Sequence, residues 1–408
     1  MEYVLFLKPL ADMVYQFPVL DYLLLGICVV ALFFVAKRIG NLLIVDVLAV
    51  VFLALLSVSL LRAFSGVYDY LKLVSAYLLY FLGRGCYGRR QRINRAIIYS
   101  HFIVILVNLG CLAVGYGFVT WGSAYTFRGM YYFKMDLALA MVYCIAVILF
   151  FTRMNFWPKL FLLAAAGGML ILTNSRISIL LAIMVAVLYA VYVREKKQKL
   201  KRIFKVRLKM VLVILLVMVL SIFAVQKLAA LPALRRYNFL SFTFNSISDF
   251  GNVSNTQGRI NIWSGILAKF ARARFYQRMI GIDLVGATWK GWETHNTYLR
   301  VLYATGYVGL LLFLSFFVAL VRRFNRVKNR NLFFFTLSLM LCFLIQGMTA
   351  TTIIFTQMTW IAFFYAGMCV TASVRERGVN YYSEKVALNK LRFRLVAHNE
   401  KKQGGKRT

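Results

Sequence analysis

Residues 295–314 read HNTYLRVLYATGYVGLLLFL, and the chain beyond Arg300 stays uncharged up to residue 320. About twenty consecutive apolar residues are enough for a helix to cross the hydrocarbon core of a bilayer. Similar runs recur along the chain, in which 62% of the residues belong to the apolar set AVILMFWYC and 15% are charged. Soluble domains are roughly half apolar and a quarter charged. The sequence therefore predicts an all-α polytopic membrane protein.

The apolar runs predict about eleven membrane spans, within a range of roughly ten to twelve. They lie near residues 19–36, 42–61, 67–82, 96–114, 136–152, 159–173, 177–193, 210–228, 297–320, 331–349 and 353–372. We expect residues 1–372 to form a single membrane domain. Its N-terminal residues lack the basic start and the cleavage site of a signal peptide, and residues 3–18 read as a short interfacial helix.

The segments that connect the spans alternate in charge. Segments 84–95, 194–209 and 322–330 are densely basic, whereas segments 62–66, 115–133 and 350–357 carry almost no Lys or Arg. Because basic loops stay in the cytoplasm, we expect these basic segments and the basic tail, residues 373–408, to be cytoplasmic. The N-terminus is then outside, unless residues 3–18 dip back into the membrane.

A net charge of +36 would suggest a nucleic-acid partner if this were a soluble protein. In a membrane protein, the topology and the attraction of basic loops to anionic headgroups account for most of this charge. We therefore expect membrane lipids, and not nucleic acid, as the partners of the basic tail.

Residues 229–296 form a long polar segment between two spans, and the alternation places this loop outside the cytoplasmic membrane. Long loops cross a membrane largely regardless of their charge. Its charged residues are Arg235, Arg236, Arg259, Lys269, Arg272, Arg274, Arg278 and Lys290 against Asp249, Asp283 and Glu293. An external cationic surface suits an anionic ligand, for which the planar guanidinium group is well shaped.

Within this loop, residues 254–275, SNTQGRINIWSGILAKFARARF, predict an amphipathic helix that starts at Asn255 or Thr256. Its apolar face is predicted to hold Ile260, Trp263, Ile266, Leu267 and Phe270, with Lys269 and Arg272 off that face. Arg259 would lie in the first turn, where a cation opposes the helix dipole. A bound anion would relieve that conflict, although Arg259 could also be a solvated residue at the helix start.

His295 stands at the external end of a predicted span. His101 lies on the cytoplasmic side and His398 in the tail, so we do not expect a histidine metal site. The six cysteines lie in apolar spans or, for Cys86, in a basic loop, which argues against a disulfide framework or a thiolate metal site. His295 could be a proton acceptor or an interfacial residue that bonds a headgroup. Glu293 could orient it or be a solvated surface charge.

Arg176 ends the motif LTNSR, residues 172–176, between two spans that leave almost no room for a loop. Arginines that only snorkel to the membrane surface are usually on the cytoplasmic side. An external arginine in a tight turn, beside Asn174 and Ser175, is a better candidate for binding an anion.

Other ionisable residues in the spans have simpler explanations. Asp69 and Lys72 are three positions apart and could pair on one helix face. Lys134 and Asp136 lie at the external end of a span and could line the same cavity as Arg176. The chain has no phosphate-binding loop, HExxH or GxSxG motif.

Three motifs together resemble the O-antigen ligase and polysaccharide polymerase superfamily of bacterial envelope glycosyltransferases. They are SRISILLAI at the start of one span, GRINIW in the external helix, and HNTYL followed by TGYVGLLLF. The resemblance covers roughly residues 130 to 350. The chain departs from the pattern at Ala304 and Thr305, where an acidic residue often precedes the GxxG pair.

The resemblance implies a glycan donor linked through pyrophosphate to a polyprenol such as undecaprenol. It implies transfer of the glycan to an acceptor hydroxyl at the outer face of the cytoplasmic membrane, without a metal or other cofactor. Carried over residue by residue, Arg176 and Arg259 would bind the pyrophosphate and His295 would take the acceptor proton. Ser175, Asn296 and Glu293 are possible supporting residues.

The acceptor separates two readings within this superfamily. A polymerase extends another lipid-linked repeat unit, and a ligase transfers the glycan to a different surface molecule such as a lipid A core. The style of GRINIW and HNTYL and the missing acidic residue favour a polymerase, with a flippase and a chain-length regulator of the same pathway as possible partners. A transporter of the lipid-linked glycan is the alternative from another class, but the sequence shows neither the internal repeats nor the broken helices common in transporters.

Overall fold

The computed structural model of the protein describes residues 1–14, 19–37, 39, 42–62, 64–121, 124–198, 254–289, 292–354, 356–357 and 359–375. The predicted span at 210–228 lies outside these ranges. So do residues 229–253 of the predicted external loop and residues 376–408 of the predicted tail.

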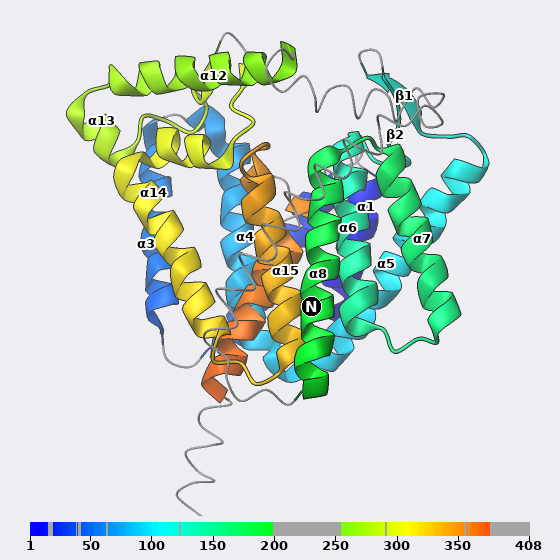
Figure 1. Ribbon diagram of the computed structural model, residues 1–408. Coiled ribbons are helices and arrows are strands. Elements are labelled where there is room, and N and C mark those ends of the chain that lie inside the picture. Colours follow the sequence, from blue (N-terminus) through cyan, green and yellow to red (C-terminus); the bar gives the residue numbers. More distant parts are fainter. Residues whose placement is uncertain are drawn as a thin grey trace, which may run out of the picture.

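The described residues are mostly helical (Figure 1). The helices are α1 (Glu2–Met13), α2 (Val19–Ala36), α3 (Ile44–Arg62), α4 (Val67–Cys86), α5 (Arg90–Ala113), α6 (Lys134–Phe151), α7 (Phe156–Leu172), α8 (Arg176–Gln198), α12 (Ser254–Ala271), α13 (Phe275–Ile280), α14 (Thr297–Phe324) and α15 (Arg330–Gln346), followed by a last helix at residues 359–375. Short 3-10 turns lie at η1 (Phe64–Gly66), η2 (Tyr87–Arg89) and η3 (Thr352–Ile354). Every predicted span except 210–228 overlaps one of these helices.

Among the described residues, 5 helices are long and apolar enough to cross a membrane. They are Ile44–Arg62, Phe64–Ala113, Lys134–Phe151, Arg176–Glu195 and Thr297–Phe324, and the second of these contains both α4 and α5. Shorter apolar helices occupy Tyr22–Ala36, Phe156–Leu172 and Arg330–Gln346. The expectation of a helical membrane protein fits this set of apolar helices.

Two short β-hairpins depart from the expected all-α fold. Strand β1 (Phe118–Trp121) pairs antiparallel with β2 (Ala124–Phe127), and β3 (Thr288–Trp289) pairs antiparallel with β4 (Trp292–Glu293). Both hairpins lie in connecting segments rich in aromatic and β-branched residues, which favour extended backbone. A two-stranded ribbon leaves backbone edges unpaired, so it belongs outside the hydrocarbon region.

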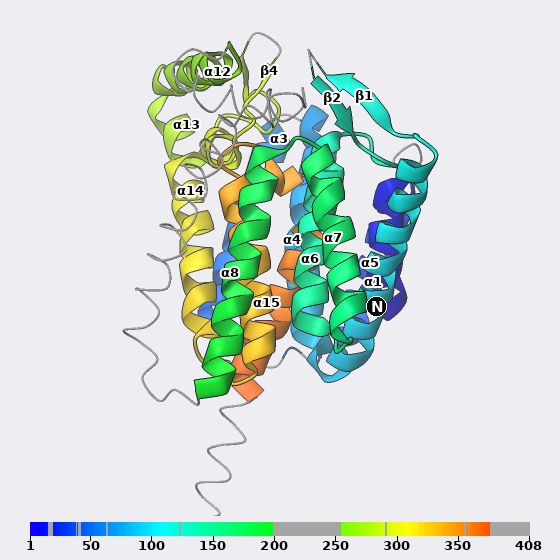
Figure 2. The same ribbon diagram turned by 45° about the vertical axis from the view of Figure 1, so that its right-hand side comes forward.

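The elements sort to the two ends of the bundle (Figures 1 and 2). At one end, called here the α12 end, lie α12, α13, the β1–β2 hairpin and the starts of α6, α8 and α14. The C-terminal ends of α8 and α14 and the junction of α4 with α5 lie at the opposite end, so the basic segments 84–95 and 322–330 are there. The basic segments 84–95 and 322–330 and the nearly uncharged segment 115–133 therefore lie at opposite ends of the bundle.

Helix α1 is part of the bundle and not a separate interfacial helix, as Figure 2 shows from the side. It packs against α5 and α2 and buries Val4, Leu5 and Met13. Lys8 is also buried, and its ammonium group donates to the Asp12 carboxylate and to Thr356 Oγ1 at 3.1 Å. A lysine can be held among apolar helices because such partners replace its lost hydration.

Aromatic side chains form the centre of the bundle. The ring of Tyr77 in α4 lies 5.4 Å from that of Phe52 in α3 and 5.3 Å from that of Phe316 in α14, between ring centroids. Phe363 of the last helix is 5.3 Å from Tyr77 in an edge-on arrangement. Tilted and edge-on pairs of this kind place the positive ring edge against a negative face. They join helices that are far apart in the sequence.

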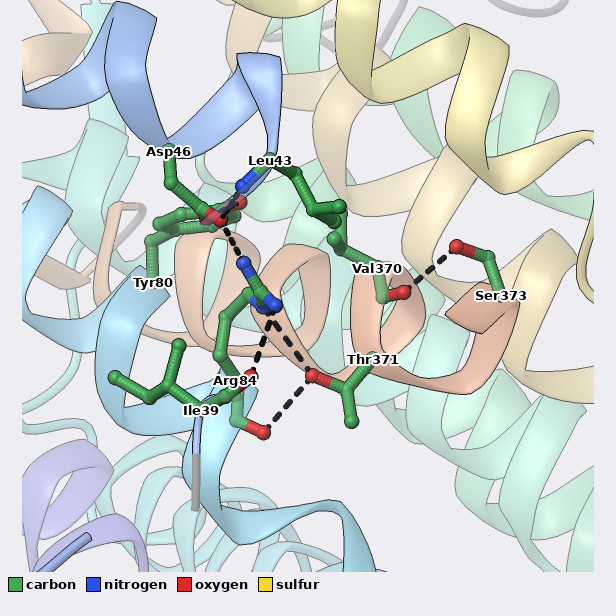
Figure 3. Close-up of polar contacts among 8 residues, drawn as sticks. All are labelled: Ile39, Leu43, Asp46, Tyr80, Arg84, Val370, Thr371 and Ser373. Carbon is green, nitrogen blue, oxygen red and sulfur yellow. Dashed lines mark hydrogen bonds and ion pairs between the residues drawn. The ribbon is translucent and has the colours of Figure 1, made fainter. Parts of the chain in front are cut away.

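A buried polar network at the end opposite to α12 holds three segments together (Figure 3). The Asp46 carboxylate, fully buried in the first turn of α3, accepts from the Tyr80 hydroxyl at 2.7 Å and pairs with the guanidinium of Arg84. Arg84 also donates to the carbonyl oxygen of Ile39 at 3.1 Å and to Thr371 Oγ1 at 3.4 Å. Arg84, which the sequence analysis placed in a basic loop, is thus a buried partner of Asp46.

Replacing Asp46 tests this network. Asp46→Asn keeps the size of the side chain but leaves Arg84 as an uncompensated buried charge. We expect a loss of about 3–5 kcal/mol in the free energy of unfolding, measured by denaturant titration of the purified protein in detergent. The matched control is Glu195→Gln, which breaks the partly exposed ion pair with Arg330 and should cost less than about 1 kcal/mol. Equal losses in the two variants would contradict this account.

Helix α14 is interrupted at Gly306, whose backbone angles are φ 68° and ψ −168°. The half-helix 297–305 therefore turns across the α12 end before the chain descends through the bundle (Figure 1). The sequence predicts one continuous span at 297–320 and no broken helix, and for α14 that prediction is wrong. Glycine is common in membrane helices, so its presence alone did not mark the break.

The loop after α13 docks into this break. The backbone N–H of Ile282 donates to the carbonyl oxygen of Tyr303 at 2.9 Å. A Cβ atom on Gly306 would lie 2.4 Å from the backbone of Met279, and one on Gly281, at φ 94°, would lie 1.9 Å from the carbonyl oxygen of Ala304. Two glycines thus allow two backbones to meet, and this contact supplies partners for groups that the interrupted helix leaves free.

Gly306→Ala should weaken this junction. The backbone conformation is one that residues other than glycine adopt at a cost of about 1–3 kcal/mol, and the added Cβ also meets the backbone of Met279. We expect a lower free energy of unfolding, measured by the same detergent titration. Gly168→Ala is the control, because a Cβ there meets nothing within 4 Å and alanine favours a helix by about 1 kcal/mol. A neutral Gly306→Ala would show that the break is not built on this glycine.

Candidate functional site

His295 occupies a strained turn whose neighbours are firmly held. Its φ is 44°, a left-handed conformation that residues other than glycine adopt at a cost. Thr294, directly before it, is fully buried and Thr297, two positions after it, is almost so, whereas His295 is exposed. Thr297 donates its N–H to the carbonyl oxygen of Gly347 at 2.8 Å and its hydroxyl to that of Ala350 at 3.1 Å. These bonds therefore fix the backbone of the turn that carries the exposed imidazole.

Asn296 completes this turn. Its side-chain oxygen caps α14 by accepting from the N–H of Leu299 at 3.0 Å, and its amide nitrogen donates to the carbonyl oxygen of Met348 at 3.2 Å. Asparagine is one of the best residues at this capping position. Predicted as a supporting residue, Asn296 lies where it fixes the backbone beside His295.

The predicted amphipathic helix is confirmed as α12, which begins at Ser254, but its buried face differs from the predicted one. Ile266 and Phe270 pack with Ile262 against Tyr303 and other residues of α14. Ile260 and Leu267, which we expected on the apolar face, are 54% and 44% exposed. The buried stripe follows a spacing of four residues because α12 lies across the half-helix of α14.

Trp263 joins α12 to the His295 turn. Its indole N–H donates to the carbonyl oxygen of Thr294 at 2.7 Å. Arg259 lies one helical turn before Trp263, so both side chains project from the same side of α12. The charge of Arg259 consequently acts on His295. The structure thus brings together two of the residues that the sequence analysis selected.

Electrostatics favour a neutral imidazole. Partial desolvation is the main cause that lowers the pKa of His295 from its ordinary value, and the nearby Arg259 charge lowers it further. The carboxylate of Glu293, an exposed residue at the end of β4, opposes this by raising the same pKa. Desolvation also lowers the pKa of Arg259. A guanidinium nevertheless stays charged at neutral pH, because its ordinary pKa is very high. At neutral pH the site holds an uncharged base beside a cation.

Arg176 is the first residue of α8, directly after a tight turn made by Asn174 at φ 52°. The Ser175 hydroxyl is buried and lies 2.8 Å from that of Ser178 and 3.3 Å from the sulfur of Met135. Ser175, a predicted supporting residue, therefore serves the packing of α8 on α6. That contact joins the N-terminal ends of two helices, and the positive ends of their dipoles favour an anion.

Lys134, the first residue of α6, lies within electrostatic range of Arg176. Its neighbour Asp136 is buried, and its carboxylate accepts from the side-chain amide of Gln357 at 2.7 Å. Asp136 is thus accounted for by packing, and Lys134 adds a second cation beside Arg176. The charges that shift His295 are those of Arg259 and Glu293, and Arg176 is not one of them. Both groups lie at the α12 end (Figure 2).

The sequence suggests that Asp69 could pair with Lys72. In the structure it pairs instead with Arg300 of α14. The partners are 231 positions apart in the chain, so spacing along one helix could not reveal them. The signal in the sequence was Arg300 itself, the charge at the N-terminal edge of a long apolar run.

Among the residues that the structure describes, no group of three or more His, Cys, Asp or Glu side chains is arranged to hold a metal ion. His101 is buried in α5, where its Nδ1 lies 2.8 Å from the carbonyl oxygen of Ile97. All six cysteines are buried and free of disulfides.

A scan against protein-family models found no match to this chain, and a search of curated proteins found no match either. The resemblance to polysaccharide polymerases and ligases therefore rests on the sequence motifs alone.

Trp263→Phe should move His295 away from Arg259, because it removes the hydrogen bond that ties the His295 turn to α12. Phenylalanine keeps the apolar contacts but cannot donate to Thr294. We expect the pKa of His295 to rise toward its ordinary value of about 6.5, because the imidazole gains water and moves away from the Arg259 charge. The pH dependence of carbethoxylation at His295, followed by mass spectrometry, measures this. The control is Trp157→Phe in α7, an exposed indole at the other end of the bundle, and an unchanged His295 profile in Trp263→Phe would contradict the coupling.

Proposed function

We propose that this protein is a bacterial envelope polysaccharide polymerase. It transfers a growing glycan from polyprenyl pyrophosphate, such as undecaprenyl pyrophosphate, to the hydroxyl of another lipid-linked repeat unit. The observation that carries the proposal is the turn at His295, which the Trp263 indole ties to the helix that carries Arg259, at one end of an apolar helical bundle. A base and an anion-binding group are what this transfer requires. Membrane lipids surround the bundle.

The proposed topology puts the α12 end outside the cytoplasm. The basic segments 84–95 and 322–330 lie at the opposite end, and positive loops stay on the cytoplasmic side. The full chain then has about eleven spans in the bacterial cytoplasmic membrane, with residues 229–296 outside and the C-terminal tail inside. In this orientation the site meets a donor whose glycan has already been moved across the membrane.

In the proposed reaction, His295 takes the proton of the acceptor hydroxyl as its oxygen attacks the anomeric carbon. The bond between that carbon and the pyrophosphate oxygen breaks, and its electron pair leaves with polyprenyl pyrophosphate. Attack from the opposite side inverts the anomeric centre. Arg259 and Arg176 bind the pyrophosphate and stabilise the charge that grows on it, with Lys134 beside Arg176. This assignment uses no metal or other cofactor.

The acceptor decides between a polymerase and a ligase. A ligase would use the same base and cations and transfer the glycan to a different surface acceptor, such as a lipid A core. A polymerase also works beside a flippase and a chain-length regulator. In cells that lack the protein, single lipid-linked repeat units should accumulate. Intact long chains that stay unattached would favour the ligase.

A transporter of the lipid-linked glycan is the second candidate, and the broken helix α14 favours it. Transporters commonly build their substrate sites from interrupted helices near the middle of the membrane. Here the break lies at the α12 end (Figure 1), where the half-helix 297–305 separates it from His295. The discriminating experiment gives purified protein in detergent lipid-linked repeat units without a membrane gradient. Longer chains indicate an enzyme.

Substitutions in that assay test the assigned roles. His295→Ala should reduce chain extension about 10²- to 10⁴-fold, the usual contribution of a positioned base. Arg259→Ala should reduce it about 10²- to 10³-fold, and Arg259→Lys should recover only part, because an ammonium lacks the planar fork. The matched control is Arg272→Ala, an exposed arginine just beyond the end of α12, which should stay near the rate of the unmodified protein.

The pH profile provides an independent check. His295 acts as a base in its neutral form, and its pKa is lowered from the ordinary value. The rate should therefore be constant near neutral pH and fall only when the pH drops below about 6.5. Full activity of His295→Ala, or a rate that rises as the solution becomes acidic, would exclude this mechanism.

A further inference from the structure

A partly buried ion pair ties the half-helix 297–305 to the rest of the bundle. Arg300, 5% exposed, pairs through its guanidinium with the carboxylate of Asp69 in the first turn of α4. The same nitrogen of Arg300 lies 3.5 Å from the carbonyl oxygen of Leu284, in the segment that follows α13. One side chain of α14 therefore contacts two other parts of the chain: α4 and the segment after α13.

The half-helix depends on such ties because the break at Gly306 separates it from the long part of α14. A continuous helix would set its direction through backbone hydrogen bonds. Instead, the Ser59 hydroxyl donates to the carbonyl oxygen of Ala304, and Arg62 donates to that of Gly281 in the docked loop. These contacts hold the C-terminal end of the half-helix, and Asp69 with Arg300 holds its middle.

The direction of the half-helix determines where His295 stands. Asn296 caps it, and His295 directly precedes that cap. Arg300 is only five positions beyond His295, so a small rotation of the half-helix about Arg300 displaces the imidazole relative to Arg259 on α12. A displacement of about 1 Å in a reacting group can cost about 10²-fold in rate.

The chemistry of the pair points to orientation more than to stability. Buried ion pairs are often no more stabilising than apolar residues of the same size. Moreover, the Nε of Arg300 is buried without a hydrogen-bond partner among the described residues, so the site does not use all the donors of the guanidinium. What a charged pair adds over apolar packing is one defined direction of contact.

We infer that Asp69 and Arg300 are positioning residues that hold His295 in register with Arg259. The inference rests on the proposed function, since it gives the pair a role in the same site. Neither residue touches the reacting atoms; both act through the half-helix.

The experiment measures chain extension by purified Asp69→Asn, Arg300→Gln and Arg300→Lys with lipid-linked repeat units. We expect kcat to fall about 10- to 100-fold in the first two variants with KM changed less than about threefold, because the pyrophosphate-binding arginines are intact. Arg300→Lys should recover part of kcat. Glu195→Gln, which breaks an ion pair at the other end of the bundle, is the matched control. A kcat within twofold of the unmodified protein, or a rise in KM alone, overturns the inference.

Carbethoxylation of His295 gives a second readout that needs no activity. Displacement of the half-helix should move the pH midpoint of this modification toward that of an ordinary histidine in Asp69→Asn and Arg300→Gln, but not in Glu195→Gln. If the protein proves not to be a glycosyltransferase, this shift still tests the positioning role. If kcat falls while the midpoint stays unchanged, the pair does not act through His295 and the inference is wrong.

A variant that removes one buried charge could fail to fold. Arg62→Gln then carries the test, because Arg62 is exposed and holds the same half-helix through Gly281. It should lower kcat by a smaller factor and move the His295 midpoint in the same direction. An Arg62→Gln protein that folds and shows neither change counts against the positioning role.

Discussion

A bilayer offers no water to an exposed peptide group, and this constraint governs the whole molecule. A helix can cross because its backbone bonds are internal, and any interruption must find partners elsewhere. In α14 the interruption at Gly306 is met by the loop that follows α13, where Ile282 donates to Tyr303. The half-helix, the turn at His295 and the helix that carries Arg259 all follow from that junction. The candidate site thus lies where the chain leaves regular helix, next to the interrupted α14.

Much of the fold was predictable because hydropathy measures the free energy of moving side chains out of water, and this free energy also decides which helices lie in a membrane. The apolar runs mark α2 to α8, α14 and α15 to within about six residues at either end, and the charge of the loops separates the two ends of the bundle. The break in α14 was not predictable, since Gly306 takes its angles only when Gly281 and Met279 pack against it. Nor was the burial of Lys8 in α1, whose ammonium group donates to Thr356, a contact across almost the whole chain.

The candidate site divides in the same way. His295, Arg176 and Arg259 could be selected from residue type and topology, because a polar residue at the edge of lipid needs a reason to be there. The proximity of Arg259 to His295 needed the bond from Trp263 to Thr294, which no periodicity reveals. The apolar face of α12 was misjudged at Ile260 and Leu267 since its packing partner is a half-helix lying across it. Asp69 was assigned to Lys72 because local spacing cannot anticipate a partner on α14.

The burial of all six cysteines has a practical side. A thiol reagent in water meets an introduced surface cysteine before any native one, so single cysteines can be added without first removing the others. A reagent that cannot cross the membrane would label a cysteine at Phe275 in intact cells if α13 faces outward, and one at Arg326 only after the cells are opened. Side-specific spectroscopic labels and cross-linkers can be attached at the same positions, because the buried native cysteines do not compete for the reagent.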